Sequence, residues 1–482
     1  MPQPARRTHH LVTFAVLALA VSAYSMLQSL VTPVLPTIMV NLHTTQTTVT
    51  WVLTAYLLSA SIFTPIVGRI GDAVGKKKLL LVALGALALG AAFSALASGI
   101  GTMIVARAIQ GVGGGILPLA FGIVREEFPR EKVSSAIGVL AALTAVGAGL
   151  GMVLAGPIVN LLDYRWLFWL PMIVVLLAAA ATVVFVPESS SRNGSRISIL
   201  PAFLLSAWLV CLLLALSKAS DWGWTSNKVV GLLIGALALA AVWVLVETKA
   251  ASPLVDMDMM RLPAVWTTNL VALLVGVGMF AFFGFVPQFV QTPSTAGYGF
   301  GASITESGLI LLPFSVTMLA VGLVSNRLAT LVGSKAVVVA GTAVAIVPFI
   351  LLAFAHGNEW VLYAATAMMG VGFGLSFAAM ASLIVEAVPA EQTGVASGMN
   401  ANIRTIGGSI GAALMTSIVT AGAAPNGLPR EEGYTHGFAM LAGVTALAVL
   451  AALAIPVIRR DGAGKPPRIE PGAACAIPAP AN

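Results

Sequence analysis

The stretch Gly68-Arg69-Ile70-Gly71-Asp72-Ala73-Val74-Gly75-Lys76-Lys77-Lys78 separates two long apolar runs and concentrates charge in a chain that has little of it. Its glycines permit a tight turn. Asp72 can accept hydrogen bonds or pair with a basic side chain, and consecutive lysines are typical of a loop on the cytoplasmic side of a membrane. Spacing alone leaves two interpretations open: an ordinary basic loop, or a functional turn between two membrane-spanning helices.

The composition of the whole chain favours a membrane setting. Of 482 residues, 58% are hydrophobic and only 9% are charged, which is too few to cover the surface of a soluble protein. A bilayer removes this requirement, because a spanning helix needs only about 20 apolar residues and satisfies its own backbone hydrogen bonds. The net charge of +7 comes from basic residues in short loops, so we expect the lipid bilayer as partner and no nucleic acid.

Apolar runs of spanning length recur along the chain, which predicts an all-α membrane protein with fourteen transmembrane helices. In this arrangement nineteen basic residues fall on one side of the membrane and four on the other, namely Arg165, Lys218, Lys228 and Arg430. The positive-inside rule then predicts a multi-pass protein of the plasma membrane with both termini cytoplasmic. The expected helices begin near Leu11, Val49, Leu79, Thr102, Val133, Trp166, Ile197, Val229, Ala264, Gly308, Ala336, Trp360, Val395 and Gly437.

The two halves of the chain resemble each other at a nearly fixed offset. A cluster of glycines beginning at Gly111 recurs 259 residues later at Gly370. The repeat places helices 2, 4 and 5 opposite helices 10, 12 and 13, so both copies have the same orientation, an arrangement typical of transporters. Six further positions recur 260 residues later: Glu126, Pro129, Glu131, Gly138, Gly147 and Gly151 match Glu386, Pro389, Glu391, Gly398, Gly407 and Gly411.

The repeat predicts a division of the chain into four parts. Residues 1–187 form a six-helix bundle, residues 188–262 hold the inserted helices 7 and 8 with their inner loops, and residues 263–460 form a second six-helix bundle. Residues 461–482 are rich in proline, glycine and alanine, and we expect them to be a disordered cytoplasmic tail.

Enzymatic chemistry has no support in the sequence. The two cysteines, Cys211 and Cys475, form no metal-ligand pattern, and the spacings of zinc proteases, nucleophile elbows and phosphate loops are absent. The glycines at 111–115 are followed by no lysine and lie in an apolar run, so helix packing explains them better than a nucleotide. We therefore expect no catalytic residue, no metal and no cofactor.

The charged stretch at 68–78 resembles the signature of the major facilitator superfamily, in which glycine, aspartate, glycine and basic residues follow each other at this spacing. Other segments resemble its fourteen-helix drug:proton antiporter group. The resemblance implies two six-helix bundles plus two inserted helices, and it covers nearly the whole chain. It rests on Gly68, Asp72 and Gly75 with the following lysines, and on the segments Trp51–Tyr56, Arg107–Gly113, Tyr164–Phe168 and Ser397–Gly408.

The resemblance implies that Asp72 belongs to an inner gate that joins the two halves while the transporter faces outward. Arg69, Glu126 and Glu127 are candidate members of the same charge network, and a solvated inner loop of mixed charge is the alternative. The predicted gate motif consists of Gly68, Arg69, Asp72, Gly75 and Lys76.

Two arginines fall within predicted spans. A charge at the centre of a membrane helix costs at least about 2.5–3.5 kcal/mol, so Arg107 should face a partner or a wet cavity. A purely structural arginine bonded to nearby carbonyl groups is the alternative. For Arg404 a functional position and a side chain that reaches the inner membrane surface are equally open.

Helix 5 carries Gly147, Gly151, Gly156 and Pro157, a pattern that resembles the glycine-proline motif associated with antiporters. The family pattern has a proline after the second of these glycines, where this sequence has Met152. Glycines at helical spacing still predict close helix packing. The expected kink is either moved to Pro157 or lost.

Polar residues within the spans are the candidates for a central cavity: Tyr24, Gln28, Tyr56, Gln110 and Asn400. Each could instead make a helix-packing hydrogen bond. The antiporter group commonly carries an aspartate in helix 1 where this chain has Leu27, and none of the eighteen acidic residues falls near the centre of a predicted span. A cavity without carboxylates suits neutral, zwitterionic or anionic amphiphiles at least as well as cationic dyes. Proton coupling is therefore implied by the resemblance alone.

Together these features predict a monomeric secondary transporter that exports small amphiphilic organic compounds by alternating access, with protons as the coupling ion that the resemblance implies. An uptake carrier or a passive uniporter of the same fold is the close alternative. A membrane-embedded sensor or enzyme is the alternative from another class.

Overall fold

The structure, a computed structural model, describes residues 10–44, 46–49, 51–188, 199–250, 253–389, 392–421 and 429–456. All regular elements in these ranges are helices. The predicted tail at residues 461–482 lies outside the described residues, as do both ends of the chain.

Fourteen helical segments in the described ranges are long and apolar enough to cross a membrane, which confirms the predicted number. Short helices outside these spans are α2 (Leu35–Asn41), α3 (Gln46–Val49), η3 (Ser294–Ala296) and α12 (Met257–Arg261). The spans contain α1 (His10–Ser29) with η1 (Thr32–Val34), α4 (Trp51–Val74), α5 (Lys76–Ala95), α6 (Ile100–Gly111) with η2 (Val112–Gly115) and α7 (Ile116–Glu127), α8 (Arg130–Leu161), α9 (Trp166–Phe185), α10 (Ile199–Trp222), α11 (Asn227–Lys249), α13 (Pro263–Gln291), α14 (Ile304–Val332), α15 (Ser334–Val344) with α16 (Ile346–Phe354), α17 (Glu359–Ala387), α18 (Thr393–Thr420) and α19 (Glu431–Leu453).

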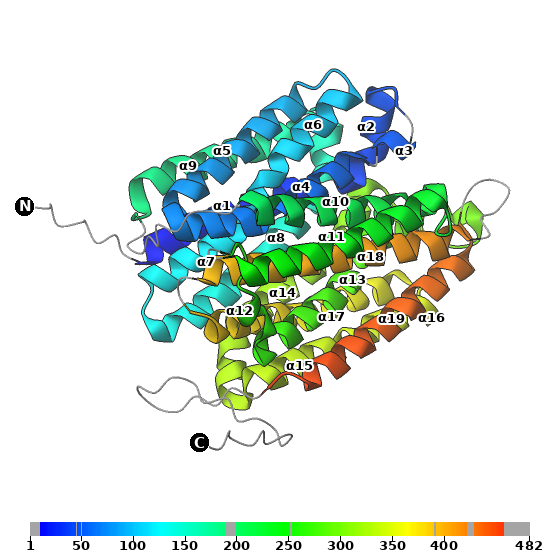
Figure 1. Ribbon diagram of the computed structural model, residues 1–482. Helices are drawn as coiled ribbons and strands as arrows, with labels where there is room; N and C mark the ends of the chain where they lie inside the picture. The colour runs from blue at the N-terminus through cyan, green and yellow to red at the C-terminus, as the bar shows by residue number, and fades with distance from the viewer. Residues whose placement is uncertain are drawn as a thin grey trace, which may run out of the picture.

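The helices run roughly alongside one another in a single elongated bundle (Figure 1). The start of α1 and the end of α19 lie at the same end, as an even number of spans requires. We call this end, which also holds Lys76–Lys78, the basic end. The surface carries large apolar side chains, among them Leu331 and Leu237 with 80% and 75% of their area exposed, which suits contact with lipid.

Helices α1 to α9, the first half, contact helices α13 to α19, the second half, through two main helix pairs. One pair is α8 with α14, and the other is α4 with α18. The sequence repeat relates α4 to α14 and α8 to α18, so these two contacts are the same contact seen from opposite halves. Such an arrangement is expected of parallel repeats around an axis along the membrane normal.

Glycines of the repeat have matching neighbours in the two halves. A Cβ atom on Gly147 of α8 would lie 2.5 Å from the carbonyl oxygen of Ser22 in α1. On the repeat counterpart Gly407 of α18 it would lie 2.0 Å from the carbonyl oxygen of Leu273 in α13. Only glycine permits backbones to approach this closely, so the repeated glycines determine the packing of α8 on α1 and of α18 on α13.

The inserted helices α10 and α11 pack against each other, and α10 contacts both α4 and α18. The Thr54 hydroxyl lies 3.1 Å from that of Ser217 in α10. Beyond the end of α10, the Trp224 indole donates a hydrogen bond to the Ser417 hydroxyl at 2.7 Å. Lys218, predicted in an outer segment, instead lies within α10 with 8% of its area exposed. The inserted pair therefore bonds to both halves along one side.

Candidate functional site

A central cavity of about 180 Å³ lies between the two halves. The first half contributes lining residues from α1, α4, α7 and α8, and the second half contributes residues from α13, α14, α17 and α18. Because both main helix pairs that join the halves, α8 with α14 and α4 with α18, border this cavity, a movement of one half against the other would change its shape.

The wall of the cavity is largely apolar and aromatic on the side of the second half. Met279, Phe280, Phe283, Phe314 and Met318 line it there. Phe283 and Phe314 pack edge to face with ring centroids 4.9 Å apart. Flexible methionines beside aromatic rings form a surface that adapts to apolar ligands of different shape.

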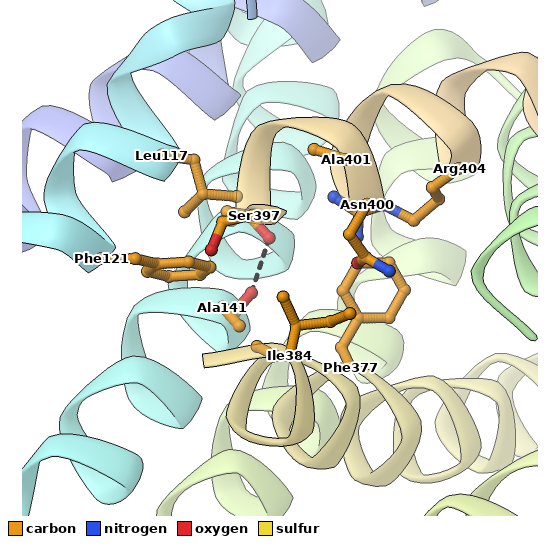
Figure 2. Close-up of a pocket in the computed structure, with 11 residues that line it drawn as sticks. Leu117, Phe121, Ala141, Phe377, Ile384, Ser397, Asn400, Ala401 and Arg404 are labelled. Carbon is orange, nitrogen blue, oxygen red and sulfur yellow. Dashed lines mark hydrogen bonds between the residues drawn. The ribbon is translucent and has the colours of Figure 1, made fainter. Parts of the chain in front are cut away.

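Arg404 gives the cavity its charge. Its guanidinium carbon lies 4.4 Å from the centroid of the Phe377 ring. Figure 2 shows a smaller pocket that Arg404 borders together with Asn400 and Ser397. Arg404 and Phe377 line both this pocket and the central cavity, so the two are adjacent. None of the described residues that line the central cavity is acidic, and the one charged side chain among them is that of Arg404.

The five predicted cavity residues fall into three groups. Tyr24 and Gln28, one helical turn apart on α1, line the central cavity. Asn400 lines the smaller pocket, where its side-chain amide donates a hydrogen bond to Asn269 at 2.8 Å. Tyr56 and Gln110 are not among the lining residues of either pocket, and both are buried.

Both of these buried residues, Tyr56 and Gln110, contact Arg107. Its guanidinium donates to the carbonyl oxygen of Val52 at 3.1 Å and to the Gln110 side chain at 2.6 Å, and lies 4.4 Å from the centroid of the Tyr56 ring. Gln110 in turn donates to the Ser94 hydroxyl at 3.1 Å. Arg107 therefore joins α4, α5 and α6 within the first half and is not among the lining residues of the central cavity.

At the basic end, the predicted gate motif forms a buried charge cluster. The Lys76 ammonium lies 3.1 Å from the Asp72 carboxylate and 2.5 Å from the Glu126 carboxylate. Gly75 between the two helices has φ 127°, a conformation that residues with side chains rarely adopt. Asp72 and Lys76 side chains are each only 1% exposed. Burial of this kind requires that the charges be paired.

The end of α4 and its turn into α5 also contact the second half. A Cβ atom on Gly68 would lie 2.7 Å from the carbonyl oxygen of Gly394 in α18. A Cβ atom on Gly394 would lie 2.8 Å from the Asp72 carboxylate. The end of α4 and the start of α18 are therefore in close contact at the basic end.

Arg125 makes further bonds across the halves, and the sequence interpretation missed it. Its guanidinium donates to the carbonyl oxygens of Val385 at 2.6 Å and Val388 at 2.8 Å, and to the Thr393 hydroxyl at 2.6 Å. Carbonyl groups at a helix C-terminus have no partner within the helix, and a basic side chain can satisfy them. The one available signal was the position of Arg125 directly before the repeated Glu126.

The segment that follows the inserted helices also lies next to the start of α18. Glu247 at the end of α11 accepts hydrogen bonds from the backbone N–H groups of Leu254 at 2.9 Å and Val255 at 3.3 Å. Asp256 then accepts a hydrogen bond from Gln392 at 2.9 Å, directly before α18. Arg69 borders a pocket with Asp256 and Gln392, so this member of the predicted motif lies beside the inserted segment.

The helix 5 glycines divide between two neighbours. Gly147 and Gly151 face α1, and a Cβ on Gly151 would lie 2.7 Å from the carbonyl oxygen of Met26. Gly156 faces α14, where its Cβ would lie 2.9 Å from the backbone nitrogen of Thr305. Helix α8 continues through Pro157 to Leu161. One helix thus packs closely on a partner in its own half and on a partner in the other half.

A sequence model of the Major Facilitator Superfamily matches residues 17–299 and 270–480. The chain belongs to this superfamily. Its membership places the chain among transporters and not among enzymes.

Several relatives of the chain are named as multidrug transporters or antibiotic exporters. The chain is 27% identical over 376 residues to the multidrug transporter protein MdtP of Bacillus subtilis, covering 77% of this chain and 68% of that one. It is 28% identical over 393 residues to the tetracenomycin C resistance and export protein of Streptomyces glaucescens, covering 79% and 70%. With the cephamycin export protein CmcT of Amycolatopsis lactamdurans it shares 28% identity over 450 residues, covering 92% and 91%.

The superfamily fold is also found among solved structures. The human organic anion transporter MFSD10 (TETRAN) matches with a TM-score of 0.65 at 15% identity, covering 93% of this chain and 100% of that one. This likeness shows the fold and confirms the fold class that the sequence predicted.

Proposed function

We propose that the chain exports small amphiphilic organic compounds by alternating access. The observation that carries this proposal is a cavity bordered by both halves, which contact each other directly at the basic end. Rocking of the halves would break the basic-end contacts and expose the cavity on that side. Relatives that are named for multidrug, tetracenomycin C and cephamycin export support outward movement of organic compounds.

The cavity wall supports an amphiphilic substrate. Aromatic and methionine side chains offer an apolar surface, and Tyr24, Gln28 and Arg404 offer polar contacts. A small number of polar groups in an apolar wall is typical of sites that bind drug-sized organic molecules.

Orientation, energy source and assembly are parts of the same proposal. We place the basic end in the cytoplasm and the chain in the plasma membrane, because the basic residues gather in loops at that end. Protons are the proposed coupling ion and the monomer the proposed working unit. Because the described lining of the cavity holds no carboxylate, we propose that the proton carrier lies elsewhere, and the buried Asp72 at the basic end is the candidate.

Transport by purified protein in vesicles tests the proposal. We expect movement of a fluorescent amphiphile driven by an imposed proton gradient, with protein-free vesicles as control. Undiminished export after a protonophore collapses the gradient would remove proton antiport, and movement only down the substrate gradient would favour a uniporter. Accumulation in the opposite direction would favour an uptake carrier. If no compound of the panel moved in either direction, the proposed transport would be refuted and a sensor would take its place.

The proposed topology has its own test. Epitope tags at the two termini should both be inaccessible to antibody in intact cells and accessible after permeabilisation. A single tag that is accessible from outside would contradict the proposed orientation.

A further inference from the structure

We propose that the central cavity selects organic acids, whose negative group binds Arg404 while an aromatic or other apolar body occupies the side lined by phenylalanines and methionines. This inference rests on the proposed transport function and names the substrate class of the same site.

The first support is the electrostatic state of the cavity. Arg404 lies in the interior of α18, and an arginine there is costly unless its charge has a partner. Among the described residues, no hydrogen bond or ion pair holds the Arg404 guanidinium. In the part of the chain that the structure describes, no acidic residue lines the cavity, so the wall does not neutralise the attraction of Arg404 for a negative group.

The second support is the contrast with Arg107, the other arginine within a span. Arg107 is fully buried, and the protein supplies it with a backbone carbonyl, an amide oxygen and an aromatic ring. Arg404 has an aromatic ring, that of Phe377, and otherwise faces two pockets. Two of the three guanidinium nitrogens of Arg107 are thus hydrogen-bonded within the protein, whereas the guanidinium of Arg404 keeps its donors for a ligand.

The third support is the set of polar and aromatic side chains that line the cavity together with Arg404. Tyr24 lines the same cavity as Arg404, and its hydroxyl can offer a second donor to the same negative group. Gln28, one turn further along α1, lines the same cavity. On the second-half side, Phe280, Phe283 and Phe314 provide flat apolar surfaces for a ring system. The cavity therefore has one cationic corner and one aromatic wall.

Three probes that share one ring system test the proposal: 2-naphthoate, its neutral amide 2-naphthamide and the cation 2-naphthylmethylammonium. Calorimetric titration of the purified full chain should show 2-naphthoate binding at least about 10-fold more tightly than 2-naphthamide, the ratio that one charge-assisted hydrogen bond supplies. The ammonium probe should bind most weakly. In vesicles the rates of movement should follow the same order.

Variants of Arg404 assign the preference to this residue. Arg404→Gln should abolish the difference between 2-naphthoate and 2-naphthamide, and Arg404→Lys should keep part of it because the charge remains. Arg327→Gln, which changes an exposed arginine at the far end of α14, is the matched control and should keep the full preference. Unchanged elution of each variant in size-exclusion chromatography shows that it is folded.

The outcomes separate this inference from the proposed transport function. Movement of the ammonium probe without preference for 2-naphthoate would refute acid selectivity and leave transport intact. A preference for 2-naphthoate that survives in Arg404→Gln would refute the role of Arg404. Binding and movement of none of the three probes by the unaltered chain would refute both.

Discussion

Arg125 and Val385 are separated by 260 residues, the offset of the internal repeat, and they touch: the Arg125 guanidinium donates to the Val385 carbonyl oxygen at 2.6 Å. Two positions that are related by a two-fold axis meet only where that axis passes. The contact therefore marks the point at the basic end about which the halves are arranged. Because the first copy has arginine and the second has valine, the bond is formed from one side alone.

Loss of the Arg125 side chain should weaken closure of the basic end. Each hydrogen bond from a charged group contributes about 1.5–3 kcal/mol, and one such loss changes the ratio of closed to open molecules about 10-fold or more. We expect Arg125→Gln to speed maleimide labelling of a cysteine placed at Ala401 in the cavity wall, with reagent added at the basic end and both native cysteines replaced by serine.

A basic side chain nearby provides the control for this experiment. Lys132 is exposed at the same end, and Lys132→Gln should leave the labelling rate unchanged. Equal rates for the Arg125 variant and the unaltered background would show that Arg125 does not hold the halves together.

The buried cluster of Asp72, Lys76 and Glu126 should depend on all three charges. Removal of one partner from a buried ion pair leaves the other charge without full compensation. Because Lys76 would still contact Glu126 in Asp72→Asn, we expect a partial loss of stability, about 1–3 kcal/mol. Thermal unfolding of Asp72→Asn, Lys76→Met and the double variant would give the coupling free energy of the pair.

Glu131 at the start of α8 is an exposed acid at the same end and supplies the comparison. Glu131→Gln should not change thermal unfolding. Additive effects of the Asp72 and Lys76 substitutions would mean that the 3.1 Å contact makes no stabilising contribution.

The sequence was sufficient for the fold because the bilayer imposes it. Apolar runs of spanning length must be helices, and the spacing of repeated glycines such as Gly147 and Gly407 reports backbone contacts that no larger residue tolerates. These signals depend on residue type and order alone, so they are visible in one sequence.

The site was less predictable, for two physical reasons. When a helix is apolar on all sides, its sequence does not show which side faces the cavity. The sequence therefore could not distinguish Tyr56 and Gln110, which contact Arg107, from Gln28, which lines the cavity. Arg125 was missed because two of its partners are backbone carbonyl groups, which every residue possesses.

Alanine in place of the repeated glycines should loosen one helix pair at a time. An added Cβ at Gly407 meets the Leu273 carbonyl oxygen at 2.0 Å, so α13 and α18 would have to separate. Overpacking of this kind costs about 1–3 kcal/mol. We expect Gly407→Ala to unfold at a lower temperature, measured by intrinsic tryptophan fluorescence of the purified chain.

Gly235 in α11 has no atom within 4 Å of an added Cβ, which makes Gly235→Ala a matched control. Alanine favours the helix over glycine, so this variant should be as stable as the parent or slightly more stable. A similar loss of stability in both variants would contradict the assigned role of the repeated glycine.

Arg107 should contribute to stability more than to transport. Its bonds to Val52 and Gln110 lie inside the first half, Arg107 is not among the lining residues of the cavity, and each bond contributes about 1.5–3 kcal/mol. Arg107→Ala leaves the Val52 carbonyl and the Gln110 amide without this donor in a buried place, so the purified variant should unfold at a clearly lower temperature. Arg107→Lys should restore little, because an ammonium group cannot reproduce the fork of donors.

At a temperature where the Arg107→Ala variant is folded, its transport per molecule should match that of the parent. A variant with parental thermal stability and no transport would instead place Arg107 in the transport cycle itself.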